Sequence, residues 1–143
     1  MAKSTTFCNN LLALIFNATA IPNIADNAAS SPLTNLYLSL HTGDPGIGGS
    51  QLTSEATYTG YARVAVARTS GGWVVSTNEA ENAALAQFPQ CTGGTNAITH
   101  VAIGTNSTGA GKVLYAGALN ATLNVANLIQ PQFSAGALVA QET

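Results

Sequence analysis

The chain has 143 residues, the length of one ordinary domain, and 46% of them are hydrophobic, which predicts a folded globular protein. Its charge content is unusual, because only 7% of the residues are Asp, Glu, Lys or Arg, against roughly 25% in typical soluble proteins. Four basic residues cannot form the stripe that binds phosphates or a run that attracts a membrane surface, so we expect neither nucleic acid nor membrane as a partner.

The surface must therefore consist mainly of Ala, Ser, Thr, Asn and Gly. Such a surface has little self-repulsion and gives up little hydration when it is covered. It suits a protein that packs against other proteins, although charge-poor surfaces also occur in secreted proteins.

The N-terminal part contains the first of two cysteines and a short apolar run. Cys8 and Cys91 are too few for a disulfide framework, and we expect free thiols. The run at residues 11–16, followed by Ala18-Thr19-Ala20, has the form of a secretory signal, but it is short and flanked by asparagines. We expect this segment to belong to the mature fold. No run approaches the roughly 20 apolar residues that span a bilayer.

Residues 4–19 predict the one helix of the chain, with Ser4 as its N-cap and Pro22 as its stop. Leu12 and Phe16 widen its apolar face, so the helix is either deeply buried or covered by a partner. Residues 20–35 have no hydrophobic period and predict an extended connector. The main apolar face is formed by Phe7, Leu11, Leu14, Ile15 and Ala18, which have helical spacing.

From residue 36 the hydrophobic period becomes two. Leucines alternate with Tyr37, Ser39 and His41, which predicts a half-buried strand over residues 36–41, followed by a turn at 42–46. The turn residues 69–72 predict that the strands on either side form a hairpin, and the loop 104–111 is a second hairpin connection. The further predicted strands are 53–59, 61–68, 73–76, 83–88, 98–103, 112–116, 118–125 and 138–141.

This order of elements predicts the fold class. Short strands at regular spacing with turns between them indicate an all-β, jelly-roll-like antiparallel sandwich of about eight strands with one N-terminal helix. We expect a single domain over residues 1–143, in which residues 36–143 form the β-sandwich.

His41 and Asp44 lie at a predicted strand-to-turn boundary and are the first candidates for a metal site. A metal needs at least one more ligand, and no sequence pattern places His100, the other histidine, beside them. We therefore interpret Asp44 as a turn-capping residue and His41 as a strand-end residue.

Glu79 and Glu81 are a pair of carboxylates that would share one face of an extended backbone, as the paired acids of a glycosidase do. They lie in an Asn-rich stretch that we interpret as a solvated turn. Trp73 stands beside valines and is interpreted as a core residue. The sequence predicts no enzyme, no catalytic, cofactor-binding or metal-binding residue, no cofactor and no small-molecule substrate.

Four segments carry a resemblance to a known family: LYLSLHTGDPG at 36–46, TSEATYTGYARV at 53–64, ITHVAIGT at 98–105 and KVLY at 112–115. Together they resemble small virion proteins of tailed phages, and among these the capsid cement, or decoration, proteins of short-tailed phages. The resemblance implies a jelly-roll homodimer. It also implies a structural role on the outer surface of the virion capsid, assembled in the host cytoplasm. There it would bridge subunits of the major capsid protein and stabilise the head against the pressure of packaged DNA.

Two alternatives to the cement role stay open. The first is a tail-fibre module that binds a receptor or a carbohydrate, since fibres also use jelly rolls. The second is a small hydrolase. For a binding protein, the expected partner-binding residues lie on the apolar helix, on the outer side of the first strand and on the polar loop 42–52; they are Phe7, Leu12, Phe16, Tyr37, Thr42, Asp44 and Leu52.

Overall fold

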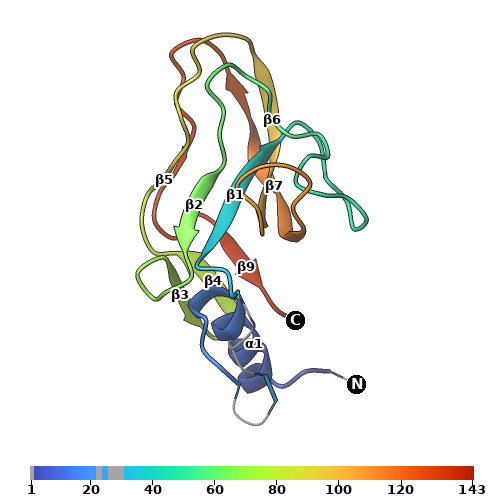
Figure 1. Ribbon diagram of the computed structural model, residues 1–143, viewed down its shortest axis with the longest axis vertical. Helices are drawn as coiled ribbons and strands as arrows, with labels where there is room; N and C mark the ends of the chain where they lie inside the picture. The colour runs from blue at the N-terminus through green and yellow to red at the C-terminus, as the bar shows by residue number, and fades with distance from the viewer. Residues whose placement is uncertain (1, 22–23, 26–30) are drawn as a thin grey trace. The chain divides into compact units, whose positions relative to one another are not determined.

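The structure, a computed structural model, describes residues 2–21, 24–25 and 31–143. The described part is mostly β, which confirms the predicted all-β class (Figure 1). No helix in it is long and apolar enough to cross a membrane. Its elements are α1 (Thr5–Asn17), β1 (Asn35–His41), β2 (Val64–Ala67), β3 (Trp73–Ser76), β4 (Glu79–Asn82), β5 (Ala86–Gln87), β6 (Asn96–Gly104), β7 (Val113–Val125), β8 (Gln132–Phe133) and β9 (Val139–Gln141).

The strands form three sheets. The largest has the order β2-β1-β6-β7, the second has the order β3-β4-β9, and β5 pairs with β8. The pairs β1–β6, β6–β7, β3–β4 and β4–β9 are antiparallel, as predicted for this class.

The chain divides into two compact units that are each built from separate segments. Unit 1 comprises Met1–Asn35, Val66–Ala86 and Phe133–Thr143, and unit 2 comprises Leu36–Ala65 and Gln87–Gln132. The single domain expected for residues 1–143 stays a prediction, because interleaved segments are compatible with either description. Each unit has its own buried, free cysteine, Cys8 in unit 1 and Cys91 in unit 2, so the predicted free thiols are confirmed.

Helix α1 belongs to unit 1 and begins as predicted. The Oγ of Ser4 accepts a hydrogen bond from the backbone N–H of Phe7 at 3.2 Å, which satisfies one of the free donors at the helix start. The helix ends earlier than predicted, at Asn17, because Ala18 adopts the left-handed conformation with φ 53°. The predicted stop, Pro22, and the connector residues 22–23 and 26–30 lie outside the described residues.

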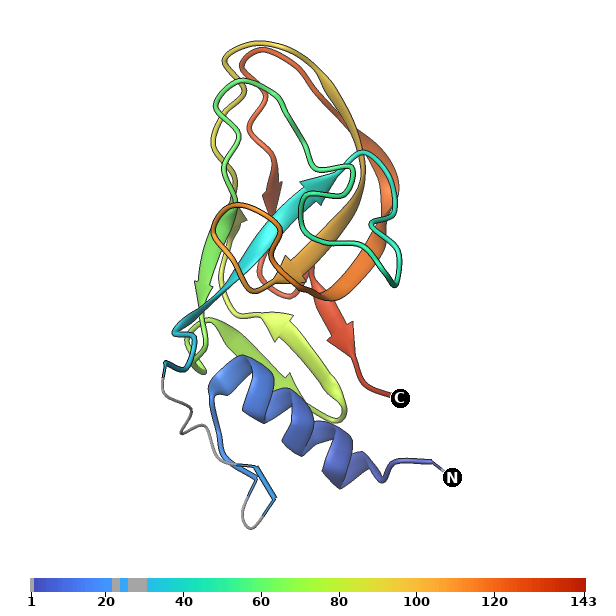
Figure 2. The ribbon, with the colours of Figure 1, turned by 45° about the vertical axis from the view of Figure 1, so that its right-hand side comes forward.

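The buried face of α1 is not the predicted one. Its buried line is Cys8, Leu12 and Phe16, at a spacing of four residues, and it lies against β3 and β4 (Figure 2). Phe16 meets the ring of Trp73 edge-on, with 4.6 Å between the ring centroids. The residues predicted for the main apolar face, such as Leu11, are only half-buried. Trp73 is fully buried, which confirms it as a core residue.

Arg68 fixes the end of α1. Its guanidinium donates to the backbone carbonyls of Leu14 and Ile15 at 2.6 Å each, and to that of Leu33 at 2.7 Å. The last carbonyls of a helix have no partner within the helix, so an arginine is well suited to satisfy them. Burial lowers the pKa of Arg68.

The hairpin predicted for residues 61–68 and 73–76 is wrong. β3 pairs instead with β4, through a two-residue turn in which Thr77 and Asn78 have φ 44° and 64°, as type I′ turns require. Glu79 and Glu81 therefore lie on a strand, where they share one face, and not in a solvated turn. β4 was missed because Glu and Asn are rare in strands, so the sequence signal favoured a loop.

Two other strand predictions are corrected. Residues 53–59 form no strand, and only isolated bridges tie Glu55 to His41 and Thr59 to Gly93. The segments 112–116 and 118–125 belong to one continuous strand, β7.

Candidate functional site

The candidate site begins on the polar side of β1, in unit 2. The leucines of β1 are buried as predicted, but Ser39 and His41 on the opposite side are fully buried too, so the strand is not half-buried. The reason is that the 42–55 loop turns back and contacts this side: the Nδ1 of His41 lies 2.8 Å from the backbone oxygen of Thr53. The pairing of β1 with β6 places His41 opposite His100, a neighbour that the sequence could not predict.

The hydrogen bonds of His41 fix its tautomer. A backbone carbonyl can only accept, so Nδ1 carries the hydrogen that is donated to Thr53, and Nε2 accepts from the Oγ of Ser39 at 2.9 Å. This assignment holds for the neutral imidazole. Burial lowers the pKa of His41, against smaller opposing effects of the Thr53 hydrogen bond and the charge of Glu55.

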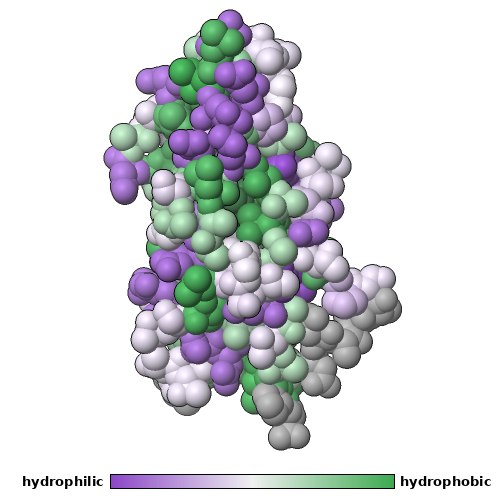
Figure 3. Space-filling model, turned by 90° about the vertical axis from the view of Figure 1, so that its left-hand side faces the viewer, coloured by the Kyte–Doolittle hydropathy of each residue, from purple (hydrophilic) through white to green (hydrophobic). Residues whose placement is uncertain are grey.

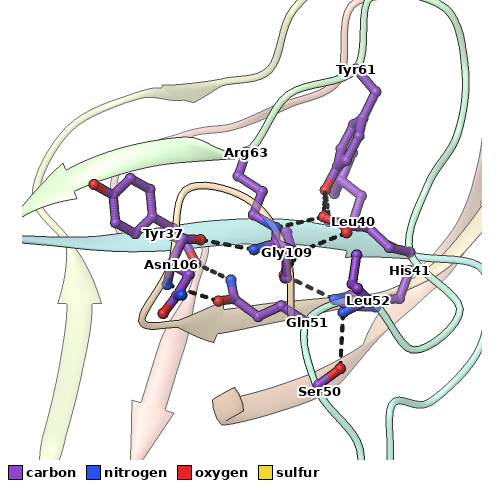
Figure 4. A network of polar contacts seen from close by, with 12 residues as sticks. Tyr37, Leu40, His41, Ser50, Gln51, Leu52, Tyr61, Arg63, Asn106 and Gly109 are labelled. Carbon is purple, nitrogen blue, oxygen red and sulfur yellow. Dashed lines mark hydrogen bonds and ion pairs between the residues drawn. The ribbon is translucent and has the colours of Figure 1, made fainter. Parts of the chain in front are cut away.

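Gln51 joins the 42–55 loop to a second loop, residues 105–112. It is fully buried, its backbone N–H donates to the carbonyl of Gly111 at 2.9 Å, and its Oε1 accepts from the backbone N–H of Asn106 at 3.0 Å. Its Nε2 donates to the backbone oxygen of Tyr37 in β1 at 3.3 Å (Figure 4). Because each polar group of this side chain is bonded, Gln51 can lie inside the protein without a large desolvation cost.

Two glycines make room for Gln51. A Cβ at Gly104 would lie 2.2 Å from the Cδ of Gln51, and a Cβ at Gly111 would lie 2.1 Å from its Oε1. Both distances are far below van der Waals contact, so the close approach of the two loops depends on the absence of a side chain at these positions.

An ion pair between Arg63 and Glu55 also connects the 42–55 loop with the 105–112 loop. The Arg63 Nε lies 2.6 Å from Glu55 Oε1, and its Nη2 lies 2.8 Å from Glu55 Oε2. Arg63 also donates to the backbone oxygens of Asn106 at 2.9 Å and Gly109 at 2.8 Å (Figure 4). The side chains of Arg63 and Glu55 are only 2% and 12% exposed, so this is a nearly buried, two-pronged pair.

Tyr61 completes this network. Its hydroxyl donates to Glu55 Oε1 at 2.9 Å and accepts from the backbone N–H of Leu40 at 3.0 Å. Burial raises the pKa of Tyr61, and the hydrogen bond with Glu55 raises the pKa of Arg63. Since a buried ion pair stabilises a structure only when its remaining donors and acceptors are satisfied, these additional bonds are what make the pair tolerable.

The braced loops expose apolar side chains and two charged residues, Asp44 and Lys112. Ile47 is fully exposed and Leu52 is 54% exposed, while Thr42 and Asp44 are exposed beside them on the 42–55 loop. Asp44 accepts from the backbone N–H of Gly46 at 2.8 Å, which confirms it as a turn-capping residue. Figure 3 shows a different face of the molecule, on which hydrophobic residues lie in small groups between hydrophilic ones.

The structure brings together only some of the predicted partner-binding residues. Thr42, Asp44 and Leu52 lie on one loop, and the half-buried Tyr37 receives a hydrogen bond from that loop through its backbone oxygen. Leu12 and Phe16 are fully buried within unit 1, so the core of that unit occupies their side chains; Phe7 is half-buried on the same helix.

Sequence reasoning missed Ile47 and the buried braces Gln51, Glu55 and Arg63. A sequence signal was available for Ile47, which is a lone branched aliphatic residue among glycines. The braces had no such signal, because Gln51 and Arg63 bond backbone groups of the 105–112 loop, far away in sequence, and a spacing of eight residues outside a regular element does not predict the contact of Glu55 with Arg63. Among the described residues, no group of three or more His, Cys, Asp or Glu side chains could hold a metal ion.

The contact between Gly104 and Gln51 can be tested by a double-mutant cycle. We expect Gly104→Ala to lower the free energy of unfolding by about 1–3 kcal/mol, because the new Cβ overlaps Gln51. Gln51→Ala should also destabilise, since it removes the hydrogen bonds of this side chain with the backbone groups of Asn106 and Tyr37. The double variant should lose clearly less than the sum, measured by urea unfolding; strictly additive losses would contradict the contact.

His41 makes stability depend on pH. Its folded pKa lies below the unfolded value of 6.5, so its contribution to stability is complete above pH 6.5 and is lost as the pH falls through the folded pKa. We expect the free energy of unfolding to fall between pH 7 and pH 5 and His41→Gln to flatten this fall. His100→Gln is the matched control, and an equal flattening by both variants would show that His41 is not responsible.

Comparisons with known proteins identify the family of the chain. The family model described as podophage GP4 fiber I protein gp80 matches residues 2–141. A search of curated proteins finds no match. The resemblance to small virion proteins of short-tailed phages is thereby confirmed, whereas the matching family is described by a fibre protein and not by a capsid cement protein. Because the match covers nearly the whole sequence, the chain belongs to the podophage GP4 fiber I protein gp80 family, a family of short-tailed-phage virion proteins.

Proposed function

We propose that this chain is a structural subunit of a phage fibre, and that it acts by binding other virion proteins and not by catalysis. The observation that carries the proposal is the braced surface of the 42–55 loop, which exposes Ile47 and Leu52 above a nearly buried Arg63–Glu55 pair. The family is described as that of a fibre protein, which supports a location in the phage fibre.

The chemistry of the loops favours a protein partner. The rigidity of the 42–55 loop favours binding, because a loop that is already ordered loses less conformational entropy when it meets a partner. The Glu55 carboxylate is hydrogen bonded to Arg63 and Tyr61, and both ring nitrogens of His41 have partners, so these groups hold the structure together. The exposed apolar side chains are the groups that gain free energy when a partner covers them.

Two alternative functions can be distinguished from this proposal by the location of the chain in the particle and by the ligand that it binds. A cement subunit would bind the major capsid protein on the outer surface of the head, and labelled antibodies would then decorate heads instead of fibres. A receptor-binding module would retain a cell-surface glycan on an array of immobilised sugars. The proposal expects labelling of fibres, and labelling confined to the head would contradict it.

Charged substitutions test the loop surface. We expect Ile47→Asp or Leu52→Asp to reduce the amount of this chain in purified particles at least tenfold, because each removes an apolar contact of about 1.5–3 kcal/mol. Leu85→Asp is the control, since Leu85 is similarly exposed but belongs to unit 1. Isolated variants should unfold at the wild-type denaturant concentration. Normal incorporation of both loop variants would refute this surface.

The homodimer implied by the resemblance has a candidate surface in β7, and we include it in the proposal. β7 is the last strand of its sheet, and Val113–Val125 contains neither a charge nor a proline, the features that usually protect an exposed edge. An antiparallel second copy centred on Gly117 would place Ala116 opposite Ala118, and both are exposed. The pairing of β7 with β6 shifts register between Ile98 and His100 and again between Ile103 and Gly104, so the regular stretch of β7 around Gly117 covers residues 115–118.

Gly117→Asp tests this dimer. A Cβ at Gly117 meets nothing within 4 Å, so the fold should accept the substitution, whereas two copies would face each other with like charges. We expect sedimentation to show a dimer for the wild type and a monomer for the variant. Ala65→Asp, also exposed, is the control and should stay dimeric. A monomeric wild type, or a dimeric Gly117→Asp, would contradict the β7 contact.

A further inference from the structure

A strained turn follows β7 in unit 2. The backbone N–H of Ile129 donates to the carbonyl of Ala126 at 2.9 Å, which closes a four-residue turn over residues 126–129. Leu128 occupies the third position with φ 71°. Turns with a positive φ at this position normally have glycine or asparagine there, because a Cβ is strained in the left-handed region.

The surrounding structure holds Leu128 in this conformation. Its backbone N–H donates to the carbonyl of Cys91 at 2.8 Å, and its carbonyl accepts from the Nε2 of Gln90 at 2.9 Å. The N–H of Cys91 in turn donates to the carbonyl of Ile129 at 2.9 Å. A strained residue persists only where its environment determines its backbone in this way, and such residues cluster at binding sites.

The fold itself gains little from the leucine side chain. Leu128 is 69% exposed and Ile129 is 42% exposed, so the chain leaves most of Leu128 and part of Ile129 uncovered. A glycine at position 128 would make the same backbone hydrogen bonds without the strain. The segment 113–141 around the turn also contains no charged residue, so a charged partner surface would find no counter-charge here.

We propose that Leu128, with Ile129 beside it, is an apolar anchor that inserts into an uncharged, aliphatic pocket of a neighbouring virion protein. This inference rests on the proposed function, because it requires a virion partner. The side chain explains why the sequence accepts strain at a turn position suited to glycine. The fixed backbone presents the leucine in one orientation, as an anchor residue requires.

Leu128→Gly separates binding from folding. We expect the isolated variant to have a melting temperature equal to or above that of the wild type, because the backbone strain is relieved. Its amount in purified phage particles should nevertheless fall at least tenfold. Leu128→Asn serves as a second variant, since asparagine also tolerates the left-handed region. Thr77→Gly is the control: it relieves a similar strain at φ 44° without removing an apolar group, and its incorporation should be unchanged.

The outcomes distinguish the two proposals. Normal incorporation of Leu128→Gly, with Ile47→Asp still excluded from particles, would overturn the anchor and leave the proposed function intact. Normal incorporation of both would overturn the proposed function as well. A clear loss of melting temperature in both Leu128 variants would show that the side chain serves the fold, and would overturn the anchor too.

Discussion

The architecture of unit 2 depends on the nearly buried ion pair between Arg63 and Glu55. The pair is tolerated because most donors and acceptors around it have a partner: Tyr61 bonds Glu55, and the carbonyls of Asn106 and Gly109 each accept a further hydrogen bond from Arg63. Removing one partner would leave a charge without compensation in a poorly solvated place, which is strongly unfavourable. Two long loops are thereby ordered by hydrogen bonds from side chains to each other and to backbone groups, and not by regular secondary structure.

The scarcity of charge has a structural counterpart. Of the four basic residues, three act within the chain: Arg63 binds Glu55, Arg68 binds carbonyls at the end of α1, and Lys3 forms an ion pair with Glu142. These groups connect segments of the chain to each other, and the exposed charged residues of the described part are Lys3, Asp44, Glu79 and Lys112. The neutral composition, which predicted a protein that packs against others, thus corresponds to a surface whose covering requires little desolvation of ions.

Local signals in the sequence were sufficient for local structure. Ser4 was recognised as the helix cap, and the alternating leucines located β1, because both patterns act over a few residues. The strand β4 was missed, since its glutamates are unfavourable in strands and it is stabilised by pairing with β3 and β9. The candidate site could be predicted only in part: the sequence pointed to the loop that carries Thr42, Asp44 and Leu52, whose binding role stays a prediction, but Gln51 and Arg63 act through contacts that no sequence spacing encodes.

The two buried cysteines offer an internal pair of reporters. Cys8 belongs to unit 1 and is 3% exposed, and Cys91 belongs to unit 2 and is 0% exposed, so neither thiol can react until its surroundings open. The alkylation rate of each thiol under native conditions therefore measures the opening free energy of one unit without an introduced label. Equal opening free energies would mean that the interleaved units unfold together. Unequal values would identify the unit that opens at the lower free energy.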